Sequence, residues 1–247
     1  MARTGSVRLP FYAAALVALA DIRAVLSGFD ETMAEPTPWD WQAINPLRVL
    51  KLFSGTTASF KKLLFLSALL CMPEGKNISD FNQLYIFKHV KMSPDWRTAF
   101  TAGWGLTMFL GGKLAVKMLD TFGQRGHTTV SNLLTVLGMA VWASKPTVGR
   151  MFLGLLVLVG AMERRAATNS MLTKSALESG FARGEFAGLF ANFRALTTMV
   201  APLFYAKVYA QSSKTPGWEG APYYAAGGLI VFAEMVHRSF TDAQLGL

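Results

Sequence analysis

Residues 151–162 read Met-Phe-Leu-Gly-Leu-Leu-Val-Leu-Val-Gly-Ala-Met, a run without a single polar side chain. A helix on the surface of a soluble protein keeps polar residues on one face, whereas a helix that is apolar all round is buried in a large core or in a membrane. No face of this run is polar, which argues against a soluble all-helical bundle. The surrounding stretch, residues 148–172, is therefore predicted to be a membrane helix.

Other parts of the chain share this apolar character. A helix needs ~20 mostly apolar residues to cross the ~30 Å hydrocarbon layer, because lipid cannot satisfy bare peptide groups. Including the first, the apolar stretches cover residues 9–29, 63–87, 100–119, 128–144, 148–172, 186–210 and 221–236. We expect an all-α integral membrane protein with about seven transmembrane helices.

Composition supports this class. The chain has 247 residues, of which 52% are hydrophobic and 16% charged, which is too apolar for an ordinary soluble domain. Its net charge of +9 is spread over the loops, a pattern that favours contact with anionic membrane lipids over nucleic acid. The single cysteine, Cys71, excludes a disulfide framework and a cysteine-based metal site. We expect no cofactor, no metal and no nucleic-acid partner.

The predicted organisation follows from where polar residues interrupt the apolar stretches. The predicted parts are a first transmembrane helix, a polar loop, a six-helix bundle and a tail, at residues 1–29, 30–62, 63–238 and 239–247. In the loop, Asn45 can cap a short helix and Pro46 can occupy its first position. Two sides are expected on this helix: Leu47, Leu50 and Phe53 or Ser54 on one, and Arg48 and Lys51 on the other. Such a helix is typical of a membrane surface.

Four short segments carry a resemblance to a known family. They are Asn45-Pro46-Leu47-Arg48, Met72-Pro73-Glu74-Gly75, residues 120–125, and Gly184-Glu185-Phe186-Ala187-Gly188 with Pro202. In order and spacing they resemble the carboxy-terminal half of a major facilitator superfamily transporter, closest to the tetracycline-efflux and hippocampus-abundant-transcript-like branch. The resemblance implies that the first stretch corresponds to the sixth helix of that family and the others to its seventh to twelfth. It also implies that Asp120 and Arg125 belong to a degraded second copy of the family's loop motif.

Ionisable residues inside the apolar stretches are candidate functional residues, because a charge at the bilayer centre costs about 3 kcal/mol. Glu163, Arg164 and Arg165 follow the apolar run directly, and Asn169 comes one turn later. One interpretation is a charged cavity wall that binds an anionic or polar solute. The other is a structural cluster, in which Glu163 neutralises one arginine and the second pairs with a carboxylate on a neighbouring helix or a lipid phosphate. Consecutive helical residues point about 100° apart, which favours the second interpretation.

The second candidate group surrounds residues 73–75, where a proline and a glycine flank Glu74. Asn77 and Asp80 follow within two turns. Proline, glycine and polar groups together predict a broken helix that lines a water-filled space, the arrangement that transporters use for solutes and coupling ions. The alternative is a local ion pair of Glu74 with Lys76 beside a kink.

The remaining polar residues are predicted to lie at the membrane interface or to contact neighbours. Arg194 can extend its charge to an interface, and Arg165 or Arg194 can contact a lipid or a partner. His89, His127 and His237 lie near predicted helix ends and are expected to be solvated or interfacial. The chain contains no phosphate-binding loop, zinc-protease motif or serine nucleophile motif, so we expect that it is not an enzyme.

Two functions remain open at this point. In the first, the chain is a half-transporter that pairs with itself or with another half and moves a small solute by alternating access. In the second, it has kept a transporter fold without transport and is a structural subunit of a larger membrane complex. Basic residues are nearly equal in number on the two faces of the family topology, and the five amino-terminal helices of the family have no counterpart here. Both observations favour the structural subunit. Either way we expect a multi-pass protein of a membrane that the sequence does not specify; an organellar membrane is one option.

Overall fold

The computed structural model describes residues 9–28, 45–54 and 56–245, and all regular structure in these ranges is helical. The expected all-α class is thereby confirmed. The chain divides into two compact units, residues 1–45 and 46–247. In the first unit the described element is α1 (Leu9–Gly28), a helix of 20 residues. Residues 30–44 of the predicted polar loop lie outside the described ranges.

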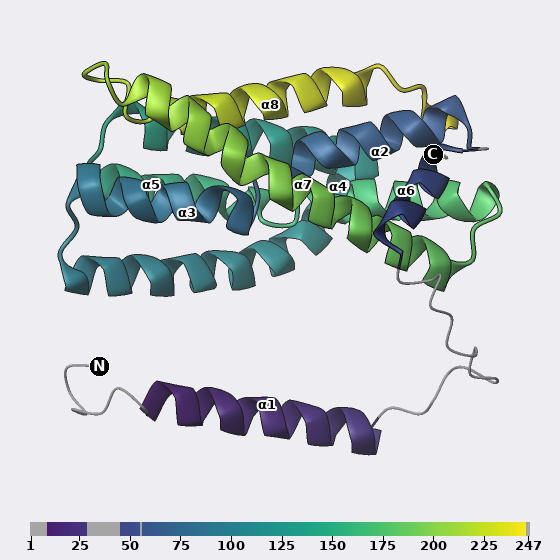
Figure 1. Cartoon of the computed structure of the whole chain (residues 1–247), viewed down its shortest axis with the longest axis horizontal. Coiled ribbons are helices and arrows are strands. Elements are labelled where there is room, and N and C mark those ends of the chain that lie inside the picture. Colours follow the sequence, from purple (N-terminus) through teal and green to yellow (C-terminus); the bar gives the residue numbers. More distant parts are fainter. Residues whose placement is uncertain (1–8, 29–44, 55, 246–247) are drawn as a thin grey trace. The chain divides into compact units, whose positions relative to one another are not determined.

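The second unit is a bundle of helices that run mostly along one common direction, with α7 crossing the others at an angle (Figure 1). Its elements are η2 (Pro46–Phe53), α2 (Ala58–Cys71), α3 (Lys76–Tyr85), η3 (Ile86–Val90), α4 (Pro94–Ser144), α5 (Val148–Leu158), η4 (Val159–Ala161), α6 (Arg165–Glu178), α7 (Arg183–Ser212), α8 (Ala221–Arg238) and α9 (Asp242–Leu245).

Helix α4 is long because two expected stretches join without an intervening loop. The junction is Gly123, whose φ of 65° and ψ of 179° are not helical. Glycine lacks a Cβ and adopts positive φ at little cost, so it can turn the chain within a single residue. We refer to residues 94–122 as the first arm of α4 and to residues 124–144 as the second arm. The turn falls within the segment that the sequence predicts as a loop, residues 120–126.

Helix α5 and η4 pack closely against both arms, through glycines. The close pairs are Gly103 with Leu155, Gly111 with Met162, Leu134 with Gly160, and Trp142 with Gly154. In the first arm, higher residue numbers pair with higher numbers of the segment from α5 onward. In the second arm, higher residue numbers pair with lower ones. The two arms are therefore antiparallel. At the tightest pair, a Cβ on Gly154 would lie 2.0 Å from Nε1 of Trp142. Glycine at these positions lets the helices approach each other closely.

Two of the seven expected stretches are broken in the middle. The first break separates α2 from α3 at residues 72–75, where Gly75 has a φ of 52°, and it confirms the prediction made from Pro73 and Gly75. The second lies between α5 and α6, where residues 159–161 form a short 3₁₀ helix and residues 162–164 a turn. The expectation of one continuous helix over residues 148–172 is therefore wrong.

One helix in the described ranges, α7, is long and apolar enough to cross a membrane by itself. Only 17% of its most apolar window is buried, so this helix presents its apolar side chains outward rather than to a protein core. The breaks explain part of the difference from the expected seven. Each of α2 and α6 has 14 residues, and α3 and α5 have fewer, so each is shorter than the ~20 residues of one crossing.

The helix predicted after Asn45 is present as η2, a 3₁₀ helix. With three residues per turn it has three lines of side chains. The exposed line is Leu47, Leu50 and Phe53; the buried line is Val49 and Leu52; the third line is Arg48 and Lys51. Both basic residues reach Glu185 at the start of α7, Lys51 through a 2.6 Å ion pair between Nζ and Oε1. The basic line therefore lies beside the exposed apolar line, and the prediction that it lies on the opposite side of the helix is wrong.

An aromatic cluster joins three helices of the bundle. Tyr223 of α8 contacts Phe81 and Tyr85 of α3 and Trp142 of α4, with ring centroids 4.9 to 5.4 Å apart. The hydroxyl of Tyr85 donates to the Trp142 carbonyl oxygen at 3.0 Å. These contacts fix α3 against the second arm of α4, and the cavity described next lies beside them.

Candidate functional site

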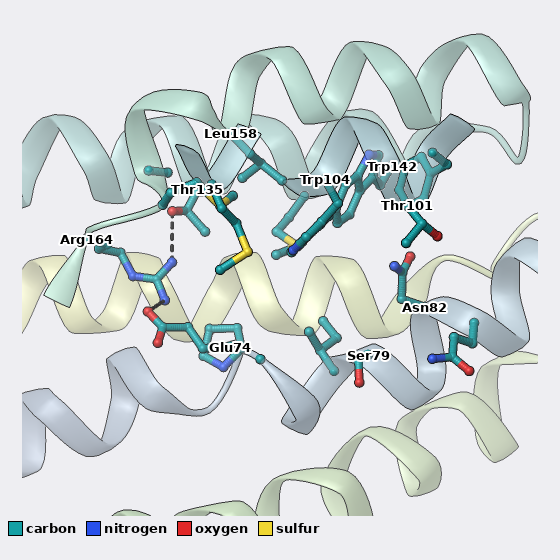
Figure 2. Close-up of a pocket in the computed structure, with 18 of the residues that line it drawn as sticks. Glu74, Ser79, Asn82, Thr101, Trp104, Thr135, Trp142, Leu158 and Arg164 are labelled. Carbon is teal, nitrogen blue, oxygen red and sulfur yellow. Dashed lines mark hydrogen bonds and ion pairs between the residues drawn. The ribbon is translucent and has the colours of Figure 1, made fainter. Parts of the chain in front are cut away.

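The two helix breaks meet, and their charged residues pair there. Arg164 lies 90 positions after Glu74 in the sequence, yet its Nη2 donates to Oε1 of Glu74 at 2.6 Å. Arg165 donates from Nε to the other oxygen of the same carboxylate. Figure 2 shows the Arg164 and Glu74 side chains pointing toward each other. We refer to these three residues as the charged triad.

Arg164 is the buried member of the triad, with 3% of its side chain exposed. Its Nη1 donates to the hydroxyl of Thr135 at 2.9 Å, and its Nη2 also donates to the Leu70 carbonyl at 2.8 Å. That carbonyl lies in the last turn of α2, where backbone acceptors lose their helical partners. A buried charge is costly unless it is paired and hydrogen-bonded. Arg164 therefore caps the carboxy-terminal end of α2. The Leu70 carbonyl and the Glu74 carboxylate in turn compensate the positive charge of Arg164.

Asn77 has a similar role at the same helix end. Its side chain is buried, and Nδ2 donates to the carbonyl of Cys71, the last residue of α2, at 2.8 Å. Asn77 is absent from the residues that line the cavity. The structure thus places this predicted coupling-ion residue at a helix end, where it satisfies the backbone of the break.

A cavity of about 440 Å³ opens beside the charged triad. Its walls come from α3, both arms of α4, α5 and the two breaks. The rings of Trp104 and Trp142 stack along one wall, with centroids 5.9 Å apart and planes inclined by 29°. In Figure 2 these rings lie between the Arg164–Glu74 pair at one end and Asn82 with Thr101 at the other. The cavity is therefore charged at one end, apolar in the middle and polar at the far end.

The charge of the cavity wall is unbalanced. Glu74 is the single acidic residue among the lining residues of this cavity, and Arg164 and Arg165 are its basic ones. One negative and two positive charges leave a net charge of +1. Glu74 and Arg165 keep 18% and 24% of their side chains exposed, so both remain reachable from the cavity. A site of this kind attracts anions.

The triad includes some of the predicted site residues and leaves others out. Both arginines pair with Glu74, whereas Glu163 is exposed; the interpretation that Glu163 neutralises one arginine is wrong. Arg165, predicted to contact a lipid or a partner, lies within the triad. Asp80 is exposed on α3 and does not line the cavity. Asn169 is partly buried on α6, and it too lies outside the cavity lining.

The loop-motif residues lie at the turn of α4. Arg125 pairs with Asp242 of α9 and also donates to the carbonyl of Phe240 at 3.1 Å, so it fastens the carboxy-terminal segment to the bundle. Asp120 is exposed at the end of the first arm. Arg194 is exposed on α7, and its lipid or partner contact stays a prediction.

A second polar cluster lies between α4 and α8. Glu234 accepts hydrogen bonds of 2.8 Å from Thr129, from Asn132 and from Arg238. His237 lies one turn further along α8, with its Nδ1 3.6 Å from Glu234. His237 and His127 are fully buried, so the expectation that these two histidines are solvated or interfacial is wrong. His89 is half-buried, and its Nε2 lies 2.8 Å from the Tyr209 hydroxyl oxygen, within hydrogen-bond distance.

The wall residues Thr135, Trp104 and Trp142 are not singled out by the sequence analysis. The two tryptophans lie in ordinary apolar helical runs, and Thr135 is one of several hydroxyl residues in the second arm. Their role depends on the fold-back at Gly123, which brings the two arms to the same cavity. The available signal in the sequence is the set of glycines in the first arm, which indicates close helix packing without naming the partner.

No family model, no curated protein and no solved structure matches this chain. The resemblance to major facilitator transporters therefore stays a prediction that depends on the segments quoted above.

Proposed function

We propose that the chain is a major-facilitator-like half-transporter, which binds a small solute in the cavity beside the charged triad and moves it by alternating access after pairing with another half. The observation that carries this proposal is the meeting of two broken helices at one cavity, with Glu74, Arg164 and Arg165 at its edge. Transporters use broken helices in this way, because freed backbone groups and charges are tolerated where they line a water-filled cavity.

The proposal places the chain across a membrane in seven spans. These are α1, the α2–α3–η3 segment, the two arms of α4, the α5–η4–α6 segment, α7 and α8, so that each broken pair forms one span. The outward side of the second unit supports this placement. Large apolar side chains are exposed there on several helices, among them Val116, Leu203 and Met235. Soluble monomers rarely expose large contiguous apolar patches.

Several features agree with the family resemblance. The first break falls at Pro73 and Gly75, and the turn between the arms of α4 falls within the degraded loop motif, residues 120–125. Pro202 lies inside α7, where it removes one helical hydrogen bond and favours a kink. The cavity volume lies within the roughly 300–1,000 Å³ that is usual for small-molecule sites. Glu74 is the proposed coupling residue, because it is the acidic residue that faces this cavity.

Alternating access can be tested with introduced cysteines, since Cys71 is the only natural one. In a Cys71→Ala background, Ser79→Cys places a thiol on the cavity wall, and Thr121→Cys places one on the exposed end of the first arm. The full chain is reconstituted in lipid vesicles and labelled with a membrane-impermeant maleimide from each side. We expect Ser79→Cys to be labelled from both sides and Thr121→Cys from one. Labelling of Ser79→Cys from one side alone would contradict the proposal.

A second function, a non-transporting structural subunit of a larger membrane complex, is favoured by the completeness of the triad. Both carboxylate oxygens of Glu74 are bound within the chain, and Arg164 has partners on α2 and on the second arm. Such a network holds the breaks together without a solute. Native mass measurement after mild detergent extraction separates the two functions. A dimer, or a pair with another half, supports transport, and a large assembly of unlike subunits supports the structural role.

A further inference from the structure

Arg165 is the member of the triad that has donors to spare. Its Nε binds Glu74, and its Nη1 donates a long hydrogen bond of 4.0 Å to the sulfur of Cys71, which is a weak acceptor. A guanidinium group carries five N–H donors and binds a carboxylate with two parallel hydrogen bonds. Both terminal nitrogens of Arg164, by contrast, already donate hydrogen bonds, to Thr135, Leu70 and Glu74. A second carboxylate that enters the cavity therefore finds its binding partner in Arg165.

The middle of the cavity suits a flat ring. Trp104 is partly exposed toward the cavity and is backed by Trp142, and Phe100 lies 6.3 Å from Trp142, centroid to centroid. Met108 and Met139 line the same space. Aromatic pairs gain energy in offset and edge-on arrangements, and methionine sulfur makes favourable contacts with rings.

The far end of the cavity limits the length of an apolar ligand. Asn82 and Thr101 lie there, opposite the charged end (Figure 2). Asn82 accepts a 2.6 Å hydrogen bond from the Tyr223 hydroxyl through Oδ1, which leaves its amide group to donate. A long acyl chain would press methylene groups against these polar side chains, and burying polar groups without partners is unfavourable. A compact ring with a polar substituent satisfies them.

From these observations we infer, building on the proposed solute-binding role, that the solute is a flat aromatic monoanion. Its carboxylate binds Arg165, its ring stacks on Trp104, and a polar group on its opposite edge reaches Asn82. One bound negative charge brings the net charge of the cavity wall from +1 to zero. A monoanion is therefore preferred over a neutral molecule and over a dianion.

The test is equilibrium binding to the full chain in lipid nanodiscs, by calorimetry, with three probes of one shape: hydroxynaphthoate, hydroxynaphthamide and naphthalene dicarboxylate. We expect the amide to bind about ten- to a hundredfold more weakly than the monoanion, the range for one hydrogen bond between charged groups. Arg165→Gln abolishes this preference, and Arg165→Lys restores part of it. Trp104→Leu weakens all three probes by roughly two- to tenfold. Arg194→Gln, an exposed arginine of α7, leaves binding unchanged and is the matched control.

Equal binding of amide and monoanion, tighter binding of the dianion, or a preference that survives in Arg165→Gln overturns the inference. The Ser79→Cys labelling experiment distinguishes that failure from a failure of the proposed function. If neutral or cationic solutes slow the labelling while hydroxynaphthoate does not, the cavity is a solute site for another class. If the thiol is labelled from one side alone, alternating access fails as well.

Discussion

Two carboxylates of this bundle, Glu74 and Glu234, differ in the charge and burial of the residues around them. Glu74 lies between two broken helices, binds two arginines and leaves an excess positive charge beside a cavity. Glu234 lies on the unbroken helix α8, where its arginine partner, Arg238, is one turn away and 68% exposed. The first carboxylate compensates the buried charge of Arg164 and the partly buried charge of Arg165, while the second binds neutral donors and an arginine at the surface. Glu74 therefore supplies the counter-charge for the two arginines of the second break, whereas Glu234 fastens α8 to the second arm of α4.

The largest expected effect is that of Glu74→Gln. Removing the carboxylate leaves Arg164 buried without a counter-charge, which typically costs about 3–5 kcal/mol of unfolding free energy. Chemical unfolding of the full chain in mixed micelles measures this loss. Glu178→Gln, at an exposed position of α6, is the control and should change stability little. A Glu74→Gln variant as stable as the natural chain would show that Arg164 does not depend on Glu74.

Glu234→Gln is expected to cost less, about 1.5–3 kcal/mol, the usual contribution of hydrogen bonds to a charged group. The amide keeps its acceptor oxygen for Thr129 or Asn132 but loses the charge that binds Arg238. The same unfolding experiment provides the comparison with Glu74→Gln. If Glu234→Gln proved the more damaging of the two, the contrast between the carboxylates would be reversed.

The third prediction addresses the backbone of the first break. Gly75 has a φ of 52°, which side chains with a Cβ rarely adopt, so Gly75→Ala should lower stability by about 1 kcal/mol. Gly188→Ala is the matched control in a helix. No neighbouring atom lies within 4 Å of its added Cβ, and alanine is the better helix former by about 1 kcal/mol. The two glycine variants should therefore change thermal stability in opposite directions, and a change in the same direction would count against a required positive φ.

The smallest effect is expected for Arg238→Gln. This arginine is mostly exposed, and exposed ion pairs contribute below about 1 kcal/mol. The unfolding free energy of the Arg238→Gln variant should lie close to that of the natural chain. Raising the salt concentration should reduce the difference between the two further. A loss as large as that of Glu234→Gln would mean that Arg238 and Glu234 act as a buried pair.

Much of the fold follows from local features of the sequence. The helical class, the break at Pro73 and Gly75 and the turn near Gly123 all come from residues that restrict or free the backbone. The sequence also indicates Glu74 and Arg164, separately, as site candidates, because each is a charge inside an apolar stretch. These are properties of single residues and their immediate neighbours.

The pairing of these residues could not be predicted, because it depends on contacts between distant segments. The second break has no proline, and Arg164 is held there by Leu70, Thr135 and Glu74 from three other places in the chain. The burial of His127 and His237 likewise depends on how α4 and α8 pack. Without an alignment of related sequences, no local pattern reports such long-range neighbours.

The three-sided helix η2 has a consequence for how the chain would sit in a bilayer. Within about two and a half turns, one side enters the core, one binds Glu185 and one faces outward with Leu47, Leu50 and Phe53. In the proposed membrane, that outward side dips among the acyl chains while Arg48 and Lys51 stay level with the headgroups. η2 then marks the level of the membrane–water interface on the bundle. A spin label at Leu50 would measure its depth, and the depths of other residues of the bundle can be compared with that value.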